Sequence, residues 1–260
     1  MPEFTHPVSG SFCWVEANLE DPEKGKGFYG ELFGWTSTDM PMPIGTYSIQ
    51  SIGGKHVCGL MKLPDQAKQM GAPPHWLNYV AVDDVAVATE KAKSLGGNVV
   101  VPPMQVGPGI MSLVADPTGG VLALWSAKES MGTFLWGEVN TLCWTELAST
   151  DVEKAKTFYT QLFGWKLESF PMGEIAYNLI KNGDQMIGGI MSQPPAMAGA
   201  PSTWSAYFAV ADCDATAAKA TKMGATVVVP PTDIPSVGRF SVIRDPQGAF
   251  FSIIKNAPQS

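Results

Sequence analysis

One pattern of bulky residues occurs twice in this 260-residue chain, and the second copy follows the first at a constant offset of 130 residues. The two copies are CWVE at 13–16, FY at 28–29 and LFGW at 32–35, then CWTE at 143–146, FY at 158–159 and LFGW at 162–165. Because so many large side chains recur in one register, we interpret the pattern as an internal duplication. Any fold for this chain must therefore contain two similar halves.

Each half predicts two successive units of a strand, a helix and three strands. Residues 13–18 alternate in the manner of a strand with two different faces, and a helix with an apolar stripe follows. Shorter alternating segments, separated by Gly and Pro turns, complete the units. The sequence therefore predicts an α+β fold of four β-α-β-β-β units paired into two domains, 8–127 and 140–257. Residues 128–139 form the linker, and its Phe134 and Leu135 predict that it packs against a domain.

The helix that follows each repeated strand has recognisable ends in the second copy. Asp151 is placed to cap the N-terminus, and Gly164 follows the last apolar position. The first copy carries Gly25 and Gly27 inside the same helix, and each glycine costs about 1 kcal/mol relative to alanine. We therefore expect the first helix to be the less stable one.

Composition excludes several classes of function. The net charge is −7 and the chain has two arginines, which argues against nucleic acid as a partner. No apolar run approaches the roughly 20 residues that span a bilayer, so no membrane partner is expected. Residues 1–10 lack the basic start and apolar centre of a secretory signal, which predicts a cytoplasmic location. Phosphate-binding, dinucleotide-binding, serine-hydrolase and zinc-protease motifs do not occur in the sequence.

The helix phrase AxxFYxxLFGW, which has Gly25 in place of its alanine in the first copy, the VxD strand ends and the DPxG turns occur in this order in both halves and resemble the vicinal oxygen chelate superfamily. This superfamily contains glyoxalases, bleomycin-resistance proteins and extradiol dioxygenases, and the resemblance covers nearly the whole chain. The doubled FYxxLFGW with paired VVVPP and DPxG segments is similar to tandem bacterial proteins of glyoxalase-like or hydroxylase-like type. The resemblance implies curved mixed sheets whose concave faces hold a divalent metal and a substrate, with His or Glu as the usual ligands.

Residue-by-residue transfer of the family's metal positions gives side chains that do not bind metals. The three positions that can be located fall on Trp14, Leu77 and Ala123 in the first half and on Trp144, Ser205 and Ser252 in the second. The fourth lies near His56 or Cys58, whose counterparts are Met186 and Gly188. Indole, isobutyl and methyl groups cannot coordinate a divalent ion. We therefore expect neither a metal nor another cofactor at these positions.

Strand alternation predicts which side chains line the two concave faces instead. The first face is expected to present Trp14, Glu16, His75, Leu77, Tyr79, Ala123 and Trp125. The second is expected to present Trp144, Glu146, Thr203, Ser205, Tyr207 and Ser252. This composition, mainly aromatic with a few polar groups, suits a small planar or apolar ligand. Because Trp125 adds an indole, we expect one ligand per chain and tighter binding at the first face.

Each of these residues also has a structural interpretation. Trp14 and Trp144 can simply fill the space that a metal and water would occupy. A carboxylate such as Glu16 or Glu146 facing an apolar cavity requires pairing, protonation or a ligand, and bonds to Tyr79 and Tyr207 would meet that need. His75 is either a general base or a solvent-exposed residue before its strand.

Two functions follow from this sequence. The leading one is metal-independent binding of a small molecule, for sequestration, resistance or sensing, by a monomer with two pseudo-symmetric domains or by its homodimer. The alternative is a lyase, isomerase or dioxygenase-like enzyme of the same superfamily. Such an enzyme would use Glu16 and Glu146 as acid–base groups or as ligands of a displaced metal, and His75 is a further catalytic candidate.

Overall fold

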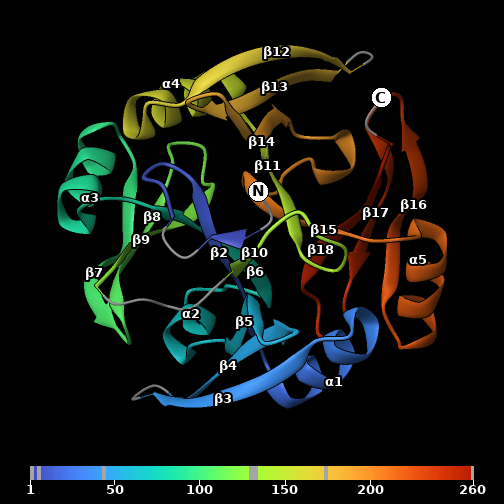
Figure 1. The fold of residues 1–260 in the computed structure, drawn as a ribbon. Coiled ribbons are helices and arrows are strands. Elements are labelled where there is room, and N and C mark those ends of the chain that lie inside the picture. The colour runs from blue at the N-terminus through green and yellow to red at the C-terminus, as the bar shows by residue number, and fades with distance from the viewer. Residues whose placement is uncertain (1–2, 5–6, 43–44, 129–133, 173–174, 259–260) are drawn as a thin grey trace.

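The computed structural model describes residues 3–4, 7–42, 45–128, 134–172 and 175–258. It contains two curved mixed sheets, one built from each half of the chain, with helices on their outer sides (Figure 1). The predicted fold class is confirmed, because each half consists of two β-α-β-β-β units.

The first half supplies ten elements to its two units. They are β2 (Phe12–Leu19), α1 (Pro22–Phe33), β3 (Thr36–Met42), β4 (Gly45–Ile52) and β5 (Lys55–Lys62), then β6 (His75–Ala81), α3 (Val85–Ser94), β7 (Asn98–Val106), β8 (Gly109–Ala115) and β9 (Val121–Ala127). A short helix, α2 (Asp65–Gln69), lies between the units in a segment that the sequence pattern predicts as a loop.

The second half repeats this series. Its elements are β11 (Leu142–Ser149), α4 (Val152–Phe163), β12 (Lys166–Met172), β13 (Ile175–Asn182) and β14 (Gln185–Ser192), then β15 (Thr203–Ala209), α5 (Cys213–Lys222), β16 (Thr226–Ile234), β17 (Gly238–Arg244) and β18 (Phe250–Asn256). A single 3-10 turn, η1 (Pro195–Met197), takes the place of α2.

The two sheets correspond strand for strand. Their orders are β3-β4-β5-β2-β6-β9-β8-β7 and β12-β13-β14-β11-β15-β18-β17-β16. In each sheet the two units meet at their first strands, which run antiparallel to one another. The repeated strands β2 and β11 are therefore central, and their inward side chains lie in the middle of each concave face.

The ends of the repeated helices match their sequence signals. The carboxylates of Asp21 and Asp151 accept hydrogen bonds from the third helical amide of α1 and α4 respectively. Gly34 and Gly164 end these helices in the left-handed conformation, with φ of 75° and 73°. Both devices satisfy backbone groups that would otherwise lack partners.

Two large hydrophobic clusters lie between the halves. In one, Phe33 of α1 packs against Phe208 of the second sheet with ring centroids 5.3 Å apart, and Phe251 joins them. In the other, Phe158 of α4 packs among residues of the first sheet, including Leu122. Each repeated helix thus contributes to a core that it shares with the other half of the chain.

Two hydrogen-bonded triads, which we call the interdomain locks, cross the same boundary. In the first lock, the Tyr29 hydroxyl donates to Asp245 Oδ2 at 2.8 Å and accepts from Trp76 Nε1 at 3.1 Å. The second lock has the same arrangement, and its members are Tyr159, Asp116 and Trp204, with distances of 2.7 and 2.8 Å. The locks explain why the FY and DPxG motifs are repeated, since each motif pairs with its partner in the opposite half.

The linker contributes a short strand to the first sheet. β10 (Phe134–Leu135) pairs with β5 at His56, and β1 (Glu3–Phe4) pairs with β10. Phe134 is 5% exposed and belongs to a hydrophobic cluster on the concave side of this sheet. The predicted packing of the linker against a domain is confirmed.

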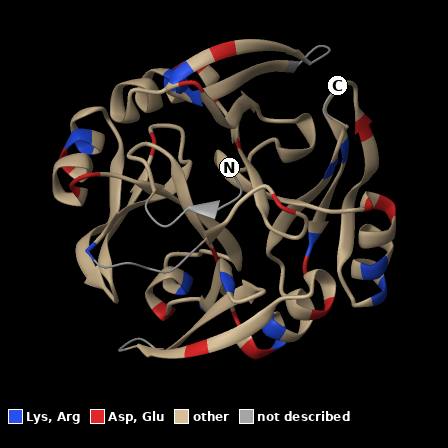
Figure 2. Cartoon of the chain, viewed as in Figure 1, with Lys and Arg blue, Asp and Glu red and all other residues tan. Residues whose placement is uncertain are grey.

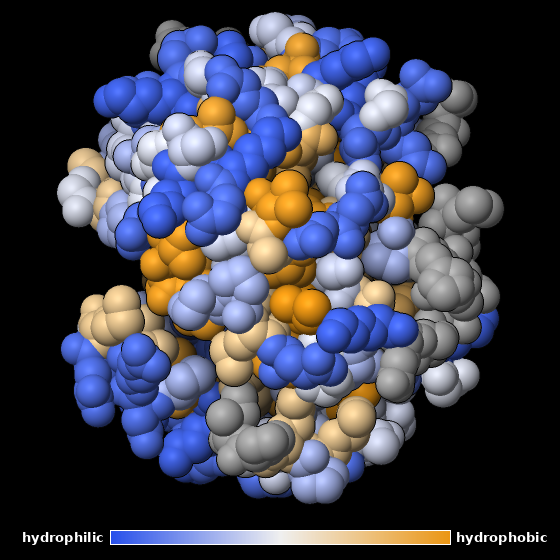
Figure 3. Space-filling view, turned by 90° about the vertical axis from the view of Figure 1, so that its left-hand side faces the viewer, coloured by the Kyte–Doolittle hydropathy of each residue, from blue (hydrophilic) through white to orange (hydrophobic). Residues whose placement is uncertain are grey.

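Charged side chains are concentrated on the helices and outer strands, whereas the centres of the sheets carry few (Figure 2). On the side of the molecule that bears α3 and β7, a hydrophobic band separates two mainly hydrophilic lobes (Figure 3). Within the described ranges, no helix is long and apolar enough to cross a bilayer.

Replacement of Gly27 with alanine is expected to raise the free energy of unfolding by about 1 kcal/mol, because an added Cβ there meets open space on the surface of α1. The same change at Gly25 places a Cβ 2.3 Å from Leu19 Cδ1, so crowding offsets the helical gain. Urea unfolding of the two variants measures the difference. A Gly27→Ala protein no more stable than Gly25→Ala would contradict this assignment.

Candidate functional site

A hydrogen-bonded network lies at the centre of the first concave face. Trp14 Nε1 donates to the Tyr47 hydroxyl at 2.6 Å, and this hydroxyl in turn bonds the Glu16 carboxyl. The Tyr79 hydroxyl and Asn18 Nδ2 also donate to Glu16 Oε1, at 3.1 and 3.2 Å. Three donors therefore surround one carboxyl that is only 4% exposed.

The second concave face repeats this network with one donor fewer. Trp144 Nε1 donates to the Tyr177 hydroxyl at 2.9 Å, and Tyr177 bonds Glu146. The Tyr207 hydroxyl donates to Glu146 Oε1 at 2.7 Å. Ala148 occupies the place of Asn18 and has no group to donate. Because a carboxylate can accept about four hydrogen bonds, Glu146 retains capacity for another donor.

Burial governs the ionisation of both carboxyls. Loss of hydration raises the pKa of Glu16 and of Glu146, and the hydrogen bonds from tyrosine hydroxyls only partly oppose that rise. The predicted bonds to Tyr79 and Tyr207 are confirmed. The pKa values of the tyrosines are raised as well, so their hydroxyls stay protonated and serve as donors.

The two faces differ in how far they are covered. In the first, Trp14 is 7% exposed, and it packs in one cluster with Leu77, Tyr79, Ala123 and Trp125. This placement follows the predicted alternation. Trp125 is itself 6% exposed, so the extra indole lies inside a packed cluster instead of facing an open pocket. The predicted order of affinity, with the first face binding more tightly, does not fit this burial.

The second face is more accessible. Trp144, Glu146 and Ser205 are half-buried, and Thr203 is exposed at its edge. Ser252 is buried and lies opposite Tyr207 in the register of β15 and β18. The predicted residues of the second face thus come together around Glu146.

The two tyrosines that complete the networks were missed by sequence reasoning. Tyr47 lies on β4 and Tyr177 on β13, and their hydroxyls lie over Gly59 and Gly189 of the neighbouring strands. A Cβ on either glycine would lie 2.1 Å from the hydroxyl oxygen. A tyrosine and a glycine that both recur at the 130-residue offset were the available signal.

His75 lies at the start of β6, opposite Asn18 in register. Its Nδ1 is 2.8 Å from the Pro73 carbonyl oxygen, so this nitrogen carries the proton when the ring is neutral. Partial burial lowers the pKa of His75, which favours the neutral ring. It is held by this local backbone contact at the edge of the first face.

The residues at the family's metal positions do not fit a divalent ion. Gly59 and Gly189 lie opposite Glu16 and Glu146 on the fourth strand of their units, with a tyrosine hydroxyl over each. Across the described part of the chain, no three His, Cys, Asp or Glu side chains are grouped so as to hold a metal. The indole–phenol–carboxyl networks occupy this space.

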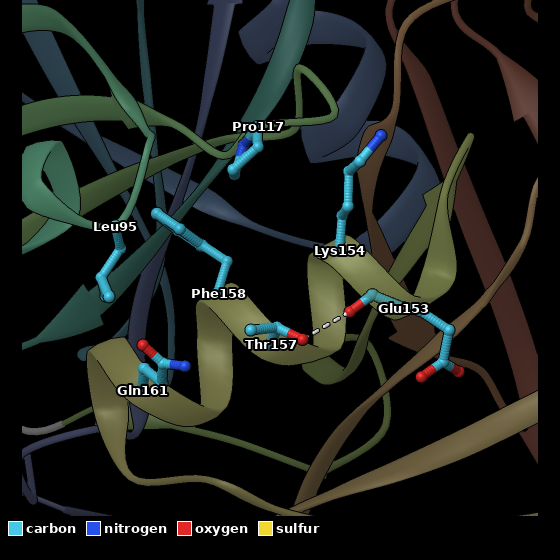
Figure 4. A pocket seen from close by; sticks show the side chains of 7 residues that line it. All are labelled: Leu95, Pro117, Glu153, Lys154, Thr157, Phe158 and Gln161. Carbon is cyan, nitrogen blue, oxygen red and sulfur yellow. Dashed lines mark hydrogen bonds between the residues drawn. The ribbon is translucent and has the colours of Figure 1, made fainter.

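Two open recesses lie elsewhere, where the halves meet on the outer side. One, of about 320 Å³, lies between α4 and the turn after β8, and is lined by Leu95, Pro117, Phe158 and polar residues of α4 (Figure 4). Its pseudo-symmetric counterpart beside α1, of about 720 Å³, contains Phe28, Met223 and Pro246. Exposed charged side chains of the two helices line both recesses, and no convergent polar group marks either as a chemical site.

In the double variant Glu16→Gln/Glu146→Gln, the loss of stability that accompanies a rise in pH above about 4.5 is expected to be smaller than in the unmodified protein. A raised carboxyl pKa means that the folded state binds more protons than the unfolded state. Stability is therefore fully present below the unfolded pKa of about 4.5 and is lost as pH rises through the folded pKa, by up to about 1.4 kcal/mol per pH unit and carboxyl.

Urea unfolding at several pH values measures this slope in both proteins. The pKa of His75 is lowered, so the contribution of this residue to stability is lost as pH falls. Both proteins contain His75, and its contribution therefore cancels in the comparison. Equal slopes for the two proteins would show that neither carboxyl titrates abnormally.

The fold and the paired concave faces define a tandem β-α-β-β-β protein with two pseudo-symmetric sites. The sequence model of the Glyoxalase/Bleomycin resistance protein/Dioxygenase superfamily matches residues 12–124 and again residues 141–253. The chain therefore belongs to this superfamily, as the resemblance implies.

Relatives align with this chain over nearly the whole length of both sequences. "Putative glyoxylase CFP32" of Mycobacterium bovis is 42% identical over 266 residues, which cover 100% of both chains. "Anthracycline biosynthesis protein DnrV" of Streptomyces peucetius is 31% identical over 263 residues, covering 96% of this chain and 95% of the relative.

Solved structures share the fold at lower identity. The Mn(II)-bound glyoxalase from Novosphingobium aromaticivorans has a TM-score of 0.65 and 15% identity, over 95% of this chain and 82% of its own. The 2,2',3-trihydroxybiphenyl 1,2-dioxygenase from Sphingomonas wittichii has a TM-score of 0.66 and 14% identity, over 96% and 91%. At this identity the likeness concerns the fold alone.

Proposed function

We propose that this protein binds a small apolar or aromatic molecule on a concave face, without a divalent metal. The observation that carries the proposal is the indole–phenol–carboxyl network at the family's metal positions. These groups offer ring surfaces, two tyrosine hydroxyls and a carboxyl, which suit an organic ligand better than a cation. A relative named for anthracycline biosynthesis adds support, because anthracyclines are polycyclic aromatic compounds.

Tryptophan fluorescence tests the proposal directly, because Trp14 and Trp144 lie in the two networks. A panel of aromatic compounds is titrated against protein purified without chelator, and Mn²⁺, Zn²⁺ and Mg²⁺ are titrated by calorimetry. We expect saturable quenching by members of the panel and no stoichiometric metal. Tight binding of one metal per site, lost in Glu16→Gln or Glu146→Gln, would overturn metal-independent binding.

An enzyme of the same superfamily is the second candidate, and the raised pKa of Glu146 is the observation that favours it. A half-buried carboxyl whose pKa is raised by burial can donate or accept a proton at a bound ligand. Glu146→Gln separates the two functions. It would abolish turnover if Glu146 transfers a proton, whereas a binding protein would show only altered affinity.

We also infer that the chain acts in the cytoplasm as a monomer whose two halves serve as pseudo-protomers. The shared clusters and the interdomain locks support this, because contacts that commonly join two subunits lie within one chain here. Light scattering after size exclusion tests the oligomeric part, and a mass of two chains would favour the homodimer.

A further inference from the structure

The first concave face is filled by the protein's own groups. The Phe134 ring meets Trp14 edge-on, with centroids 5.2 Å apart and an interplanar angle of 82°, and it also contacts His56 at 5.8 Å. Asn18, farther along the same strand, supplies a hydrogen bond to Glu16. In the first face, the chain itself therefore places an aromatic ring against Trp14 and gives the Glu16 carboxyl an additional hydrogen-bond donor.

The second face lacks both of these groups. No aromatic ring packs on Trp144 among the residues that the structure describes, and Trp144 is half-buried where Trp14 is buried. The counterpart of His56 is Met186, which is 58% exposed. Within the same described ranges, β14 pairs with β11 and β13 alone, so no strand equivalent to β10 covers it. Ala148 replaces Asn18, which leaves Glu146 one donor short.

We propose that the second face is the ligand site and that its ligand is a planar aromatic molecule bearing a hydroxyl group. This inference rests on the proposed function and specifies which face acts and what it binds. The ligand ring takes the place that Phe134 has in the first half and lies against Trp144. The ligand hydroxyl donates to Glu146, whose carboxyl lacks the hydrogen bond that Asn18 gives to Glu16.

The spacing of the two anchors suits a molecule of two fused rings. Trp144 and Glu146 are two residues apart on one face of β11, and each residue of a strand advances the chain by about 3.3 Å. The anchors are therefore separated by roughly 6.6 Å along the strand. A hydroxylated bicyclic ring spans that distance, with its ring at the indole and its hydroxyl at the carboxyl.

The experiment uses 2-naphthol as the probe and 2-methoxynaphthalene, which has the same rings and no donor, as its matched control. Calorimetry on the full chain is expected to give one 2-naphthol per chain. 2-Methoxynaphthalene should bind about tenfold more weakly, because the hydrogen bond from the ligand hydroxyl to the Glu146 carboxyl is lost. Trp144→Ala should abolish binding. Trp14→Ala, which alters the first face, should leave the affinity of the second face unchanged.

Two further variants test whether the protein's own side chains can take the place of the ligand. Ala148→Asn supplies the missing donor within the second face and should weaken 2-naphthol binding about tenfold while leaving 2-methoxynaphthalene unaffected. Phe134→Ala should open the first face and raise the stoichiometry to two, with the added site about tenfold weaker because Asn18 still donates to Glu16. Leu135→Ala, which alters the adjacent residue of the same strand, should leave it at one.

Equal affinities for the two naphthalenes, no effect of Ala148→Asn, or loss of the single site in Trp14→Ala would overturn this inference while leaving the proposed function intact. Two equal sites in the unmodified protein would do the same. If neither naphthalene nor any other aromatic compound of the panel binds at millimolar concentration, both proposals fail. If Phe134→Ala does not fold, the Ala148→Asn comparison still decides.

Discussion

Replacement of Asp245 with alanine is expected to lower the free energy of unfolding by roughly 3–5 kcal/mol, the largest effect among the changes considered. This carboxylate is 4% exposed and accepts from the Tyr29 hydroxyl and from the amides of Gln247 and Ala249, at 2.8, 2.8 and 2.9 Å. Its removal leaves two buried donors, the Tyr29 hydroxyl and the Ala249 amide, and the half-buried Gln247 amide without this acceptor. Each unsatisfied buried group costs about 1–3 kcal/mol.

Removal of the carboxylate from the second lock should cause the same loss of stability. Both losses should exceed the loss caused by removing an ordinary helix cap. Asp116→Ala is expected to behave like Asp245→Ala, and Tyr29→Phe, which removes one donor, should cost about 1.5–3 kcal/mol. Asp84→Ala is the control, since it removes an exposed N-cap at the start of α3 worth about 1 kcal/mol. Urea unfolding measures all four variants. If Asp245→Ala costs no more than Asp84→Ala, the locks do not hold the halves together.

Gly189→Ala is expected to displace the Tyr177 hydroxyl and to lower the free energy of unfolding by about 2–3 kcal/mol. A Cβ at this position lies 2.1 Å from that oxygen and 2.4 Å from Cζ, so the ring must move. The displaced hydroxyl can no longer join Trp144 to Glu146. Affinity of the second face for its ligand should fall with the stability.

Gly59→Ala is the matched change in the first face, where the contact with the Tyr47 hydroxyl is equally close. It should destabilise the protein to a similar extent but leave ligand binding at the second face unchanged. Gly27→Ala provides the control for the substitution itself, because its Cβ meets no neighbour. Near-ultraviolet circular dichroism and the binding titration report the two effects separately. A Gly189→Ala protein with normal stability would show that Tyr177 has room to move.

Local sequence signals were sufficient for the units and for much of both faces. Period-2 alternation placed Trp14, Glu16 and Tyr79 on one side of their strands, and capping residues located the repeated helices. β3 and β12 were not located from the sequence, because β3 is an exposed edge strand that contains a proline and has no buried face to impose alternation. β12 corresponds to it in the second sheet.

Contacts between distant strands and between halves could not be predicted in the same way. Tyr47 reaches Glu16 because β4 and β2 flank β5, and that order depends on the whole sheet. The position of Phe134 over Trp14 depends on how the linker returns to the first sheet. The pairing of α1 with the second sheet likewise has no local signal, although repetition of its Tyr and Asp partners was visible in the sequence.

The shared cores restrict how a duplicated chain of this kind can diverge. Tyr29 and Tyr159, with their Trp and Asp partners, are identical in the two halves, because a change at any of them would disturb a boundary on which both halves depend. The side chains of the concave faces do not belong to the interdomain locks. Four of the differences between the copies lie on these faces, namely Asn18 to Ala148, Leu77 to Ser205, Ala123 to Ser252 and Trp125 to Ile254. The proposal that only the second face binds a ligand therefore requires changes on that face alone and none at the shared boundary.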